Sequence, residues 1–225
     1  MYVSMRYMRK TRMPEKIIDL FDIGKDSKFN SKPLAHLHTY YLSGEIKEPE
    51  HYIDIFDSIR SASETDIIRI HINSSGGHLF TAIQFMRVMR ESQAQIICSV
   101  EGACMSAATM IFLSGSSFEI SEHSMFMFHN YSSIVIGKGG EMYDNIVHER
   151  KWSERILRQV YKNFLTEDEI KSILDNKDIW MEGEEVIRRL KKVKEKEIEK
   201  LVKPSKKPTK KPAKKPTKQT KNAQT

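Results

Sequence analysis

An alternation of strand and helix patterns along much of the chain constrains its fold most. Helical spacing of apolar residues separates the strand patterns, and one helical run, residues 107–113, is apolar on all sides. A helix of that kind runs through a core, and strands that alternate with helices favour stacked βαβ units around a largely parallel sheet. We therefore predict an α/β fold. The expected strands are residues 39–46, 66–72, 95–100 and 124–128, and the other expected helices are residues 52–59, 82–89 and about 141–164.

A serine, a histidine and an aspartate lie in this order along the chain, beside these elements. Ser106 starts the apolar helix, His129 ends the last strand, and Asp178 follows further along. A serine hydroxyl becomes a nucleophile only when an imidazole takes its proton, and an acid must hold that imidazole in the right tautomer. Their order and placement favour a catalytic triad. A helix-capping serine would suit the position of Ser106 as well, and both roles can hold together.

Other residues compete for each of these roles. His71 and His78 flank a glycine turn upstream and are the rival bases, whereas Asp175 and Glu182 are the rival acids. Cys104 precedes Ser106 by two residues and is the rival nucleophile. The remaining histidines lie in polar, helical or turn contexts, where we expect them to be solvated: His36, His38, His51, His123 and His148.

Two glycines end the segment that follows the strand at 66–72. There the chain reads Asn73-Ser74-Ser75-Gly76-Gly77. Glycine tolerates positive φ and lets the backbone come close to a ligand, so N–H groups at this turn can face a developing oxyanion. A phosphate-binding loop is not expected, because the chain has no Gly-x4-Gly-Lys-Ser/Thr pattern.

Taken in order, these segments resemble the proteolytic subunit of the Clp protease. The resemblance covers roughly residues 40–186. It includes residues 178–186, which are similar to the family's Asp-x-aromatic-apolar-x-small-x-Glu-Ala motif. It implies the spiral of ββα units shared by Clp peptidases and crotonases, with the helix at about 141–164 as a protruding handle. It also implies a serine endopeptidase that cleaves peptide bonds inside an oligomeric chamber.

The resemblance assigns site residues and partners as well. It implies a homo-oligomeric ring, most simply of seven subunits or a double ring of these, acting on protein or peptide substrates. No metal and no cofactor are expected. The implied triad is Ser106, His129 and Asp178, the implied oxyanion hole is formed by the N–H groups of Gly77 and Ala107, and the implied substrate groove is edged by Gly76, Gly137, Gly139 and Gly140.

Some residues depart from the family's pattern. Ser75 replaces a proline, and Ala107-Ala108 replace Met-Gly, which a backbone oxyanion contact tolerates. Residues 188–192, Arg-Arg-Leu-Lys-Lys, replace a Gly-apolar-x-Asp signature, and residues 1–30 do not match the axial loops of the family. These differences count against docking to a Clp ATPase.

Composition divides the chain into four parts. We expect an N-terminal segment at 1–30 with one short apolar patch at 17–21, the peptidase domain at 31–192, and a charged helical extension at 193–202. Residues 203–225 contain nine lysines and no acid, so the remainder carries a net charge of −2 although the whole chain carries +7. A segment this polar cannot bury enough surface to fold. It is either a solubilising tail or a salt-dependent contact with nucleic acid or another acidic surface.

The remaining composition fits a globular protein without a membrane anchor. No stretch approaches the roughly 20 apolar residues of a membrane span, and no apolar segment follows the basic start as in a secretory signal. We therefore expect a cytoplasmic protein. Cys98 and Cys104 lack the spacing of metal ligands, and we expect both to be buried and reduced.

Several alternative functions remain at this point. Within the peptidase class, a bacteriophage or prophage enzyme that matures capsids or processes other substrates without an ATPase fits the departures above. From another class, a non-catalytic ring subunit or scaffold would keep the fold and use the lysine tail to contact nucleic acid. A crotonase-type acyl-CoA enzyme would leave Ser106 and His129 without a role.

Overall fold

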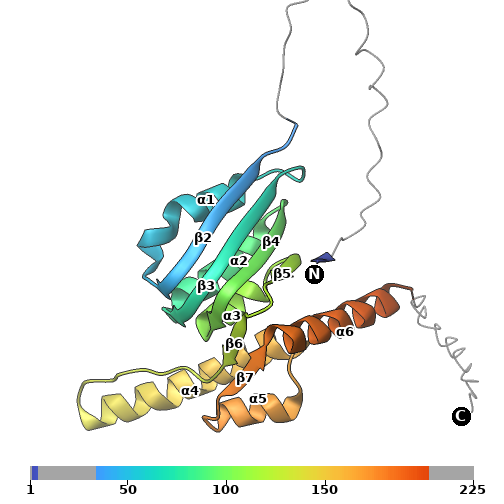
Figure 1. The fold of residues 1–225 in the computed structure, drawn as a ribbon. Coiled ribbons are helices and arrows are strands. Elements are labelled where there is room, and N and C mark those ends of the chain that lie inside the picture. Colours follow the sequence, from blue (N-terminus) through green and yellow to red (C-terminus); the bar gives the residue numbers. More distant parts are fainter. Residues whose placement is uncertain (1, 5–33, 203–225) are drawn as a thin grey trace, which may run out of the picture.

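The computed structural model describes residues 2–4 and 34–202, which form a seven-stranded sheet with helices packed against it (Figure 1). The strands are β1 (Tyr2–Ser4), β2 (Leu37–Ile46), β3 (Ile67–Gly77), β4 (Gln95–Met105), β5 (Ser117–Ile120), β6 (Met125–Phe128) and β7 (Ile179–Glu182). The helices are α1 (Ile53–Ser61), α2 (Leu79–Glu91), α3 (Ala107–Phe112), α4 (Gly139–Tyr161), α5 (Glu167–Leu174) and α6 (Gly183–Val202), with a 3-10 turn, η2 (Pro49–Tyr52), before α1. The predicted α/β class is confirmed.

Strand β4 changes its partner along its length, and this change positions the site. Strands β2 to β5 run parallel in the order β5-β4-β3-β2, and β1 pairs antiparallel with β5. Residues 97–100 of β4 pair with β5, whereas residues 103–105 pair with β6. Strand β7 then pairs antiparallel with β6. The ends of β4, β6 and β7 therefore lie together.

The core lies between the sheet and the helices α1, α2 and α3, which cover one of its faces (Figure 1). Alternate residues of β3, among them Ile68, Ile70 and Ile72, are fully buried on that face, as the two-residue period of a strand requires. Every residue of α3 is buried, which confirms the prediction from its uniformly apolar sequence. Burial of α3 fixes the residue that precedes it, Ser106.

Two helices extend from this body in different directions (Figure 1). Helix α4 is the expected long helix and begins at Gly139, so Gly139 and Gly140 belong to its first turn. Helix α6 runs without a break from Gly183 to Val202, across the boundary expected at residue 192. No helix in residues 34–202 combines the length and the apolarity needed to cross a bilayer.

Some elements were not predicted from the sequence. Strands β5 and β7 are four residues long and include polar residues, and α5 is eight residues long, so no periodic pattern stands out. The equally short β6 was predicted because all four of its residues are apolar. Strands β3 and β4 continue through their polar ends to Gly77 and Met105, because backbone pairing with their neighbours persists there. The apolar patch at 17–21 and the lysine-rich tail lie outside the described residues.

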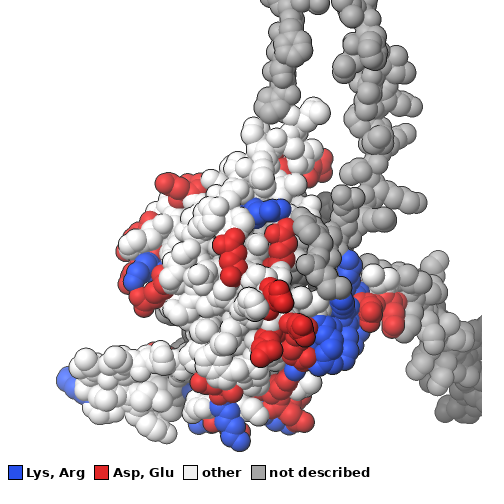
Figure 2. All heavy atoms as spheres, in the orientation of Figure 1, with Lys and Arg blue, Asp and Glu red and all other residues white. Residues whose placement is uncertain are grey.

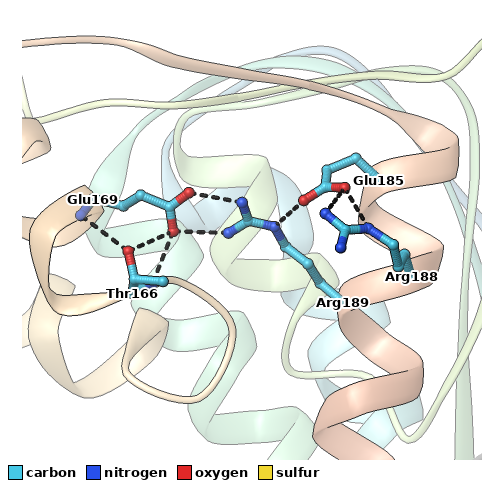
Figure 3. Close-up of polar contacts among 5 residues, drawn as sticks. All are labelled: Thr166, Glu169, Glu185, Arg188 and Arg189. Atoms are coloured by element: carbon cyan, nitrogen blue, oxygen red, sulfur yellow. Dashed lines mark hydrogen bonds and ion pairs between the residues drawn. The ribbon is translucent and has the colours of Figure 1, made fainter.

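A network of charged residues joins α5 and α6, the helices that precede and follow β7 in the chain (Figure 3). Arg189 of α6 donates two hydrogen bonds to the carboxylate of Glu169 on α5, at 2.7 and 2.8 Å, and one to Glu185 at 2.6 Å. Glu169 also closes a capping box with Thr166 at the start of α5, a motif that satisfies two otherwise unpaired backbone N–H groups. The pKa of the Glu169 carboxyl is lowered to about 2, chiefly because of the hydrogen bonds from Arg189.

Candidate active site

Ser106 lies on a sharp turn between β4 and α3. Its φ of 54° and ψ of −128° lie outside the regions that side-chain-bearing residues prefer. Such strain costs of order 1–3 kcal/mol and persists only where the surroundings fix it. Here the backbone N–H of Ser106 donates a 2.8 Å hydrogen bond to the carbonyl of Met127 on β6. The turn therefore presents the Ser106 hydroxyl beside the end of β6.

His129 follows β6 and contacts that hydroxyl directly. Its Nε2 lies 2.6 Å from Ser106 Oγ, within hydrogen-bonding distance. Because the pairing of β4 with β6 joins Met105 to Met127, the two side chains are brought together by adjacent strands. A neutral imidazole in this position can accept the hydroxyl proton.

Asp178 directly precedes β7, and His129 directly follows β6, the strand with which β7 pairs. Strand β7 pairs Ile179 with Phe128, so the next antiparallel step sets Asp178 against His129. Asp178 is exposed, and among residues 34–202 no hydrogen bond joins its carboxylate to the imidazole. Beside it, the Asn130 side chain donates to Asn176 Oδ1 at 3.0 Å, which ties the loop after His129 to the loop before Asp178.

The glycine turn at the end of β3 packs against Ser106. Gly76 has a φ of +93°, and a Cβ there would lie 2.6 Å from Ser106 Cβ and 3.1 Å from the backbone nitrogen of Ala107. Ser74 secures the turn, because its hydroxyl accepts from the Gly76 N–H and donates to the Gly44 carbonyl. Only glycine permits this close approach of two backbone segments.

The N–H of Ala107 belongs to the first residue of α3, a position that has no intrahelical acceptor. A helix start also carries partial positive charge. Ala107 and Gly77 both line the cavity that Ser106 faces. The Ala107 N–H therefore lies beside the serine without an intrahelical partner, as one donor of an oxyanion site requires, whereas Gly77 lines the same cavity and pairs with Ile46 of β2.

A cavity of about 560 Å³ opens beside Ser106 and His129. Its apolar wall includes Leu79 and Phe80 at the start of α2 and Trp152 and Ile156 on α4. The ring centroids of Phe80 and Trp152 lie 5.3 Å apart. Sequence reasoning missed Phe80 and Trp152, because they are 72 positions apart and no local pattern links them.

The rival residues have other partners. His71 Nδ1 lies 2.6 Å from Glu101 Oε1, and His78 caps α2 by accepting from the Thr81 N–H. Cys104 is fully buried, and burial raises the pKa of its thiol well above its usual value. A buried, protonated thiol is a poor nucleophile. Cys98 is likewise buried and free, with its pKa raised to about 12 by burial.

The glycines expected to edge the substrate groove fall in two places. Gly76 adjoins Ser106, whereas Gly137 precedes α4 and Gly139 and Gly140 begin it. The residues of α4 that line the cavity start at His148. These three glycines therefore lie before the part of α4 that borders the cavity.

A serine on a strained strand-to-helix turn, hydrogen-bonded to a histidine beside a cavity, is an arrangement typical of hydrolases. A family model described as Clp protease matches residues 41–189 of the sequence. A comparison with curated proteins found no match. The chain belongs to the Clp protease family, as the resemblance implied, and its fold is of the ClpP type. Family membership indicates a peptidase with peptide substrates and an oligomeric assembly.

Proposed function

We propose that this protein is a serine endopeptidase in which Ser106 is the nucleophile, His129 the general base and Asp178 the acid. The observation that carries the proposal is the 2.6 Å contact between His129 Nε2 and Ser106 Oγ at the strained turn before α3. In the reaction, His129 takes the serine proton as Oγ attacks the scissile carbonyl, and later gives it to the leaving amine.

The proposed role of Asp178 rests on sheet register rather than on a contact. A carboxylate that faces the imidazole can accept the Nδ1–H and stabilise the imidazolium that forms during attack. Catalytic hydrogen bonds are often long in free enzymes and tighten in the substrate complex. We propose that Asp178 closes on His129 in the assembled, substrate-bound enzyme.

The backbone N–H groups of Gly77 and Ala107 form the proposed oxyanion hole. The adjacent cavity has an apolar wall that includes Phe80 and Trp152, so the favoured substrate carries a large apolar side chain next to the scissile bond. An extended peptide that leaves the cavity along α4 would reach Gly140, Gly139 and Gly137, where it could add as a strand. The proposed enzyme acts inside a homo-oligomeric ring, most simply a heptamer.

The proposed domain organisation follows these assignments. The peptidase domain spans about 31–192 and contains every proposed site residue. The segments before and after it lie outside the proposed chemistry.

Labelling with a fluorophosphonate serine probe tests the proposal. Mass spectrometry of the labelled full-length protein should find the adduct on Ser106, and Ser106→Ala or His129→Ala should lower kcat for peptide cleavage by about 10⁴-fold. Asp178→Asn should lower kcat by a smaller factor. Cys104→Ala is the control, and it should keep the peptidase activity. An assembled protein that leaves Ser106 unlabelled and cleaves no peptide would instead favour the non-catalytic scaffold.

A further inference from the structure

Three side chains outside the candidate active site gather at the edge of the sheet where β2 begins. His36 directly precedes β2, His38 is its second residue, and Asp66 directly precedes β3. One donor atom from each lies within 4.8 Å of the other two. These residues have no part in the proposed peptidase chemistry.

The backbone places all three side chains on one face of the sheet. Residues two apart on a strand share a face, so His36 and His38 project to the same side. The parallel register pairs Leu37 with Ile67 and thus sets Asp66 beside His36. Backbone bonds fix this pair, because the Ile67 N–H donates to the His36 carbonyl at 2.9 Å.

Asp66 is a buried carboxylate that is already held in position. Its residue is 7% exposed, and its Oδ2 accepts hydrogen bonds from the N–H and the hydroxyl of Ser63 at 2.8 and 2.7 Å. Its Oδ1 accepts from the His36 N–H at 2.7 Å and lies 3.2 Å from His36 Nδ1. A buried carboxylate is costly unless a cation or hydrogen bonds compensate its charge.

We propose that His36, His38 and Asp66 form a binding site for Zn²⁺ at the edge of the sheet. Two imidazoles and one carboxylate are a donor set that suits zinc, which binds nitrogen and oxygen at about 2.0–2.2 Å and completes a tetrahedron with water. A tetrahedral ion holds its ligand atoms roughly 3.3 Å apart at such bond lengths. His36 Nδ1 and Asp66 Oδ1 are already 3.2 Å apart, so the imidazole of His38 is the ligand that must approach the other two on binding.

Ser63 supplies the outer shell of this site. Its two hydrogen bonds hold Oδ2 of the Asp66 carboxylate, as outer-shell partners of metal ligands commonly do, whereas His36 contacts Oδ1. Since β2 is the edge strand, a bound ion would fasten it to β3 close to where residues 34–202 begin. The expected effect of the ion is therefore to stabilise the pairing of β2 with β3, with water rather than a fourth side chain completing its coordination.

A second cluster on the same part of the chain is the rival. Glu48, Glu50 and His51 also offer three donor atoms within 4.8 Å, but all three are exposed and lie in or beside the short turn η2. Acidic groups of this kind are common without a metal. The variant His51→Ala therefore separates the two clusters.

Zinc titration by calorimetry, with Co²⁺ absorption as a spectroscopic check, tests the site. The full-length chain without a polyhistidine tag, stripped of metal and carrying His129→Ala so that the active-site imidazole cannot contribute, should bind one Zn²⁺ per subunit. Ser63→Ala should weaken binding by roughly 10- to 100-fold, the usual cost of losing an outer-shell partner. His36→Ala and His38→Ala should weaken binding further, with circular dichroism showing that the variants stay folded.

Two controls make the result decisive. His51→Ala and His123→Ala remove exposed histidines elsewhere and should leave the affinity unchanged, and Zn²⁺ should raise the melting temperature of each of these variants. The proposal is overturned if no stoichiometric Zn²⁺ binds, or if binding survives His36→Ala with His38→Ala while disappearing in His51→Ala.

Discussion

Gly76 lies so close to Ser106 that a Cβ on the glycine would come within 2.6 Å of the serine Cβ. We therefore expect Gly76→Ala to displace the Ser106 turn and to lower kcat/KM by at least about 100-fold, since misplacement by 1 Å can cost that much. Peptide hydrolysis and thermal unfolding measure the effect.

Gly44→Ala is the matched control, because Gly44 also has a positive φ, +76°, but a Cβ added there would meet nothing within 4 Å. It should cost about 1–2 kcal/mol of backbone strain and leave the activity of the folded protein intact. Equal losses of activity in both variants would show that strain, and not the contact with Ser106, governs the site.

Arg189→Met removes the link between α5 and α6 (Figure 3). Hydrogen bonds between charged groups contribute about 1.5–3 kcal/mol, so we expect the free energy of unfolding to fall by about 1–3 kcal/mol at neutral pH. The pKa of Glu169 is lowered from 4.5 to about 2, so its contribution is present above pH 4.5 and is lost as the pH falls toward 2. The difference in the free energy of unfolding between Arg189→Met and the parent should therefore become smaller as the pH falls from 4.5 toward 2.

Arg188→Met is the control for Arg189→Met. Arg188 bonds to Glu185 within the same helix and is largely exposed, so its removal should cost less than about 1 kcal/mol. Denaturation curves at several pH values compare the two. A loss in Arg188→Met as large as that in Arg189→Met would contradict the importance of the α5–α6 link.

Trp152→Ala should weaken the binding of substrates with large apolar side chains. Truncating one side of the cavity wall removes apolar contact worth about 2–3 kcal/mol, which corresponds to a roughly 30- to 150-fold rise in KM with a smaller change in kcat. Lys151→Ala, an exposed neighbour that does not line the cavity, is the control. Unchanged KM for apolar peptides would exclude this wall from substrate recognition.

Exposed apolar residues around the start of α4 should mediate assembly. Ile134 and Ile136 are 90% and 92% exposed, and Tyr143 and Ile146 on α4 are at least half exposed. Such a patch is unusual on a monomer. Ile136→Asp should shift sedimentation toward smaller species, whereas Ile136→Val should not. Sedimentation that shows an active monomer at micromolar concentration would contradict the proposed ring.

Removing residues 203–225 should abolish any binding to nucleic acid while leaving peptide hydrolysis unchanged. The nine lysines of this tail would bind without sequence preference, with a log–log salt slope of about −0.9 per phosphate neutralised. The rest of the chain has net charge −2, and acidic side chains gather over the face of the sheet in Figure 2. Equal DNA affinity of the truncated and full-length proteins in filter binding would refute a role for the tail.

The sequence predicted the positions of Ser106 and His129 because each is marked locally, one by a turn of small residues before an apolar helix and the other by the end of an apolar strand. Asp178 carried no such mark and was assigned through the family motif; its contact with His129 stays a prediction. The cavity wall was beyond sequence reasoning, because Phe80 and Trp152 meet only when α2 and α4 pack. Strand β5 was missed because Ser117 and Glu119 interrupt its four residues, whereas the equally short β6 is apolar throughout.

The hydrogen bond from the Ser106 N–H to the Met127 carbonyl joins the two chain segments that carry the proposed nucleophile and base. Ser106 follows β4 and His129 follows β6, and these two strands pair directly. The proposed acid, Asp178, precedes β7, which pairs with β6 and lies in the chain between α5 and α6, the helices that Arg189 joins. We therefore expect a partner that displaces α5 or α6 to shift Asp178 relative to His129 and to change the rate of catalysis, while the contact between Ser106 and His129 persists.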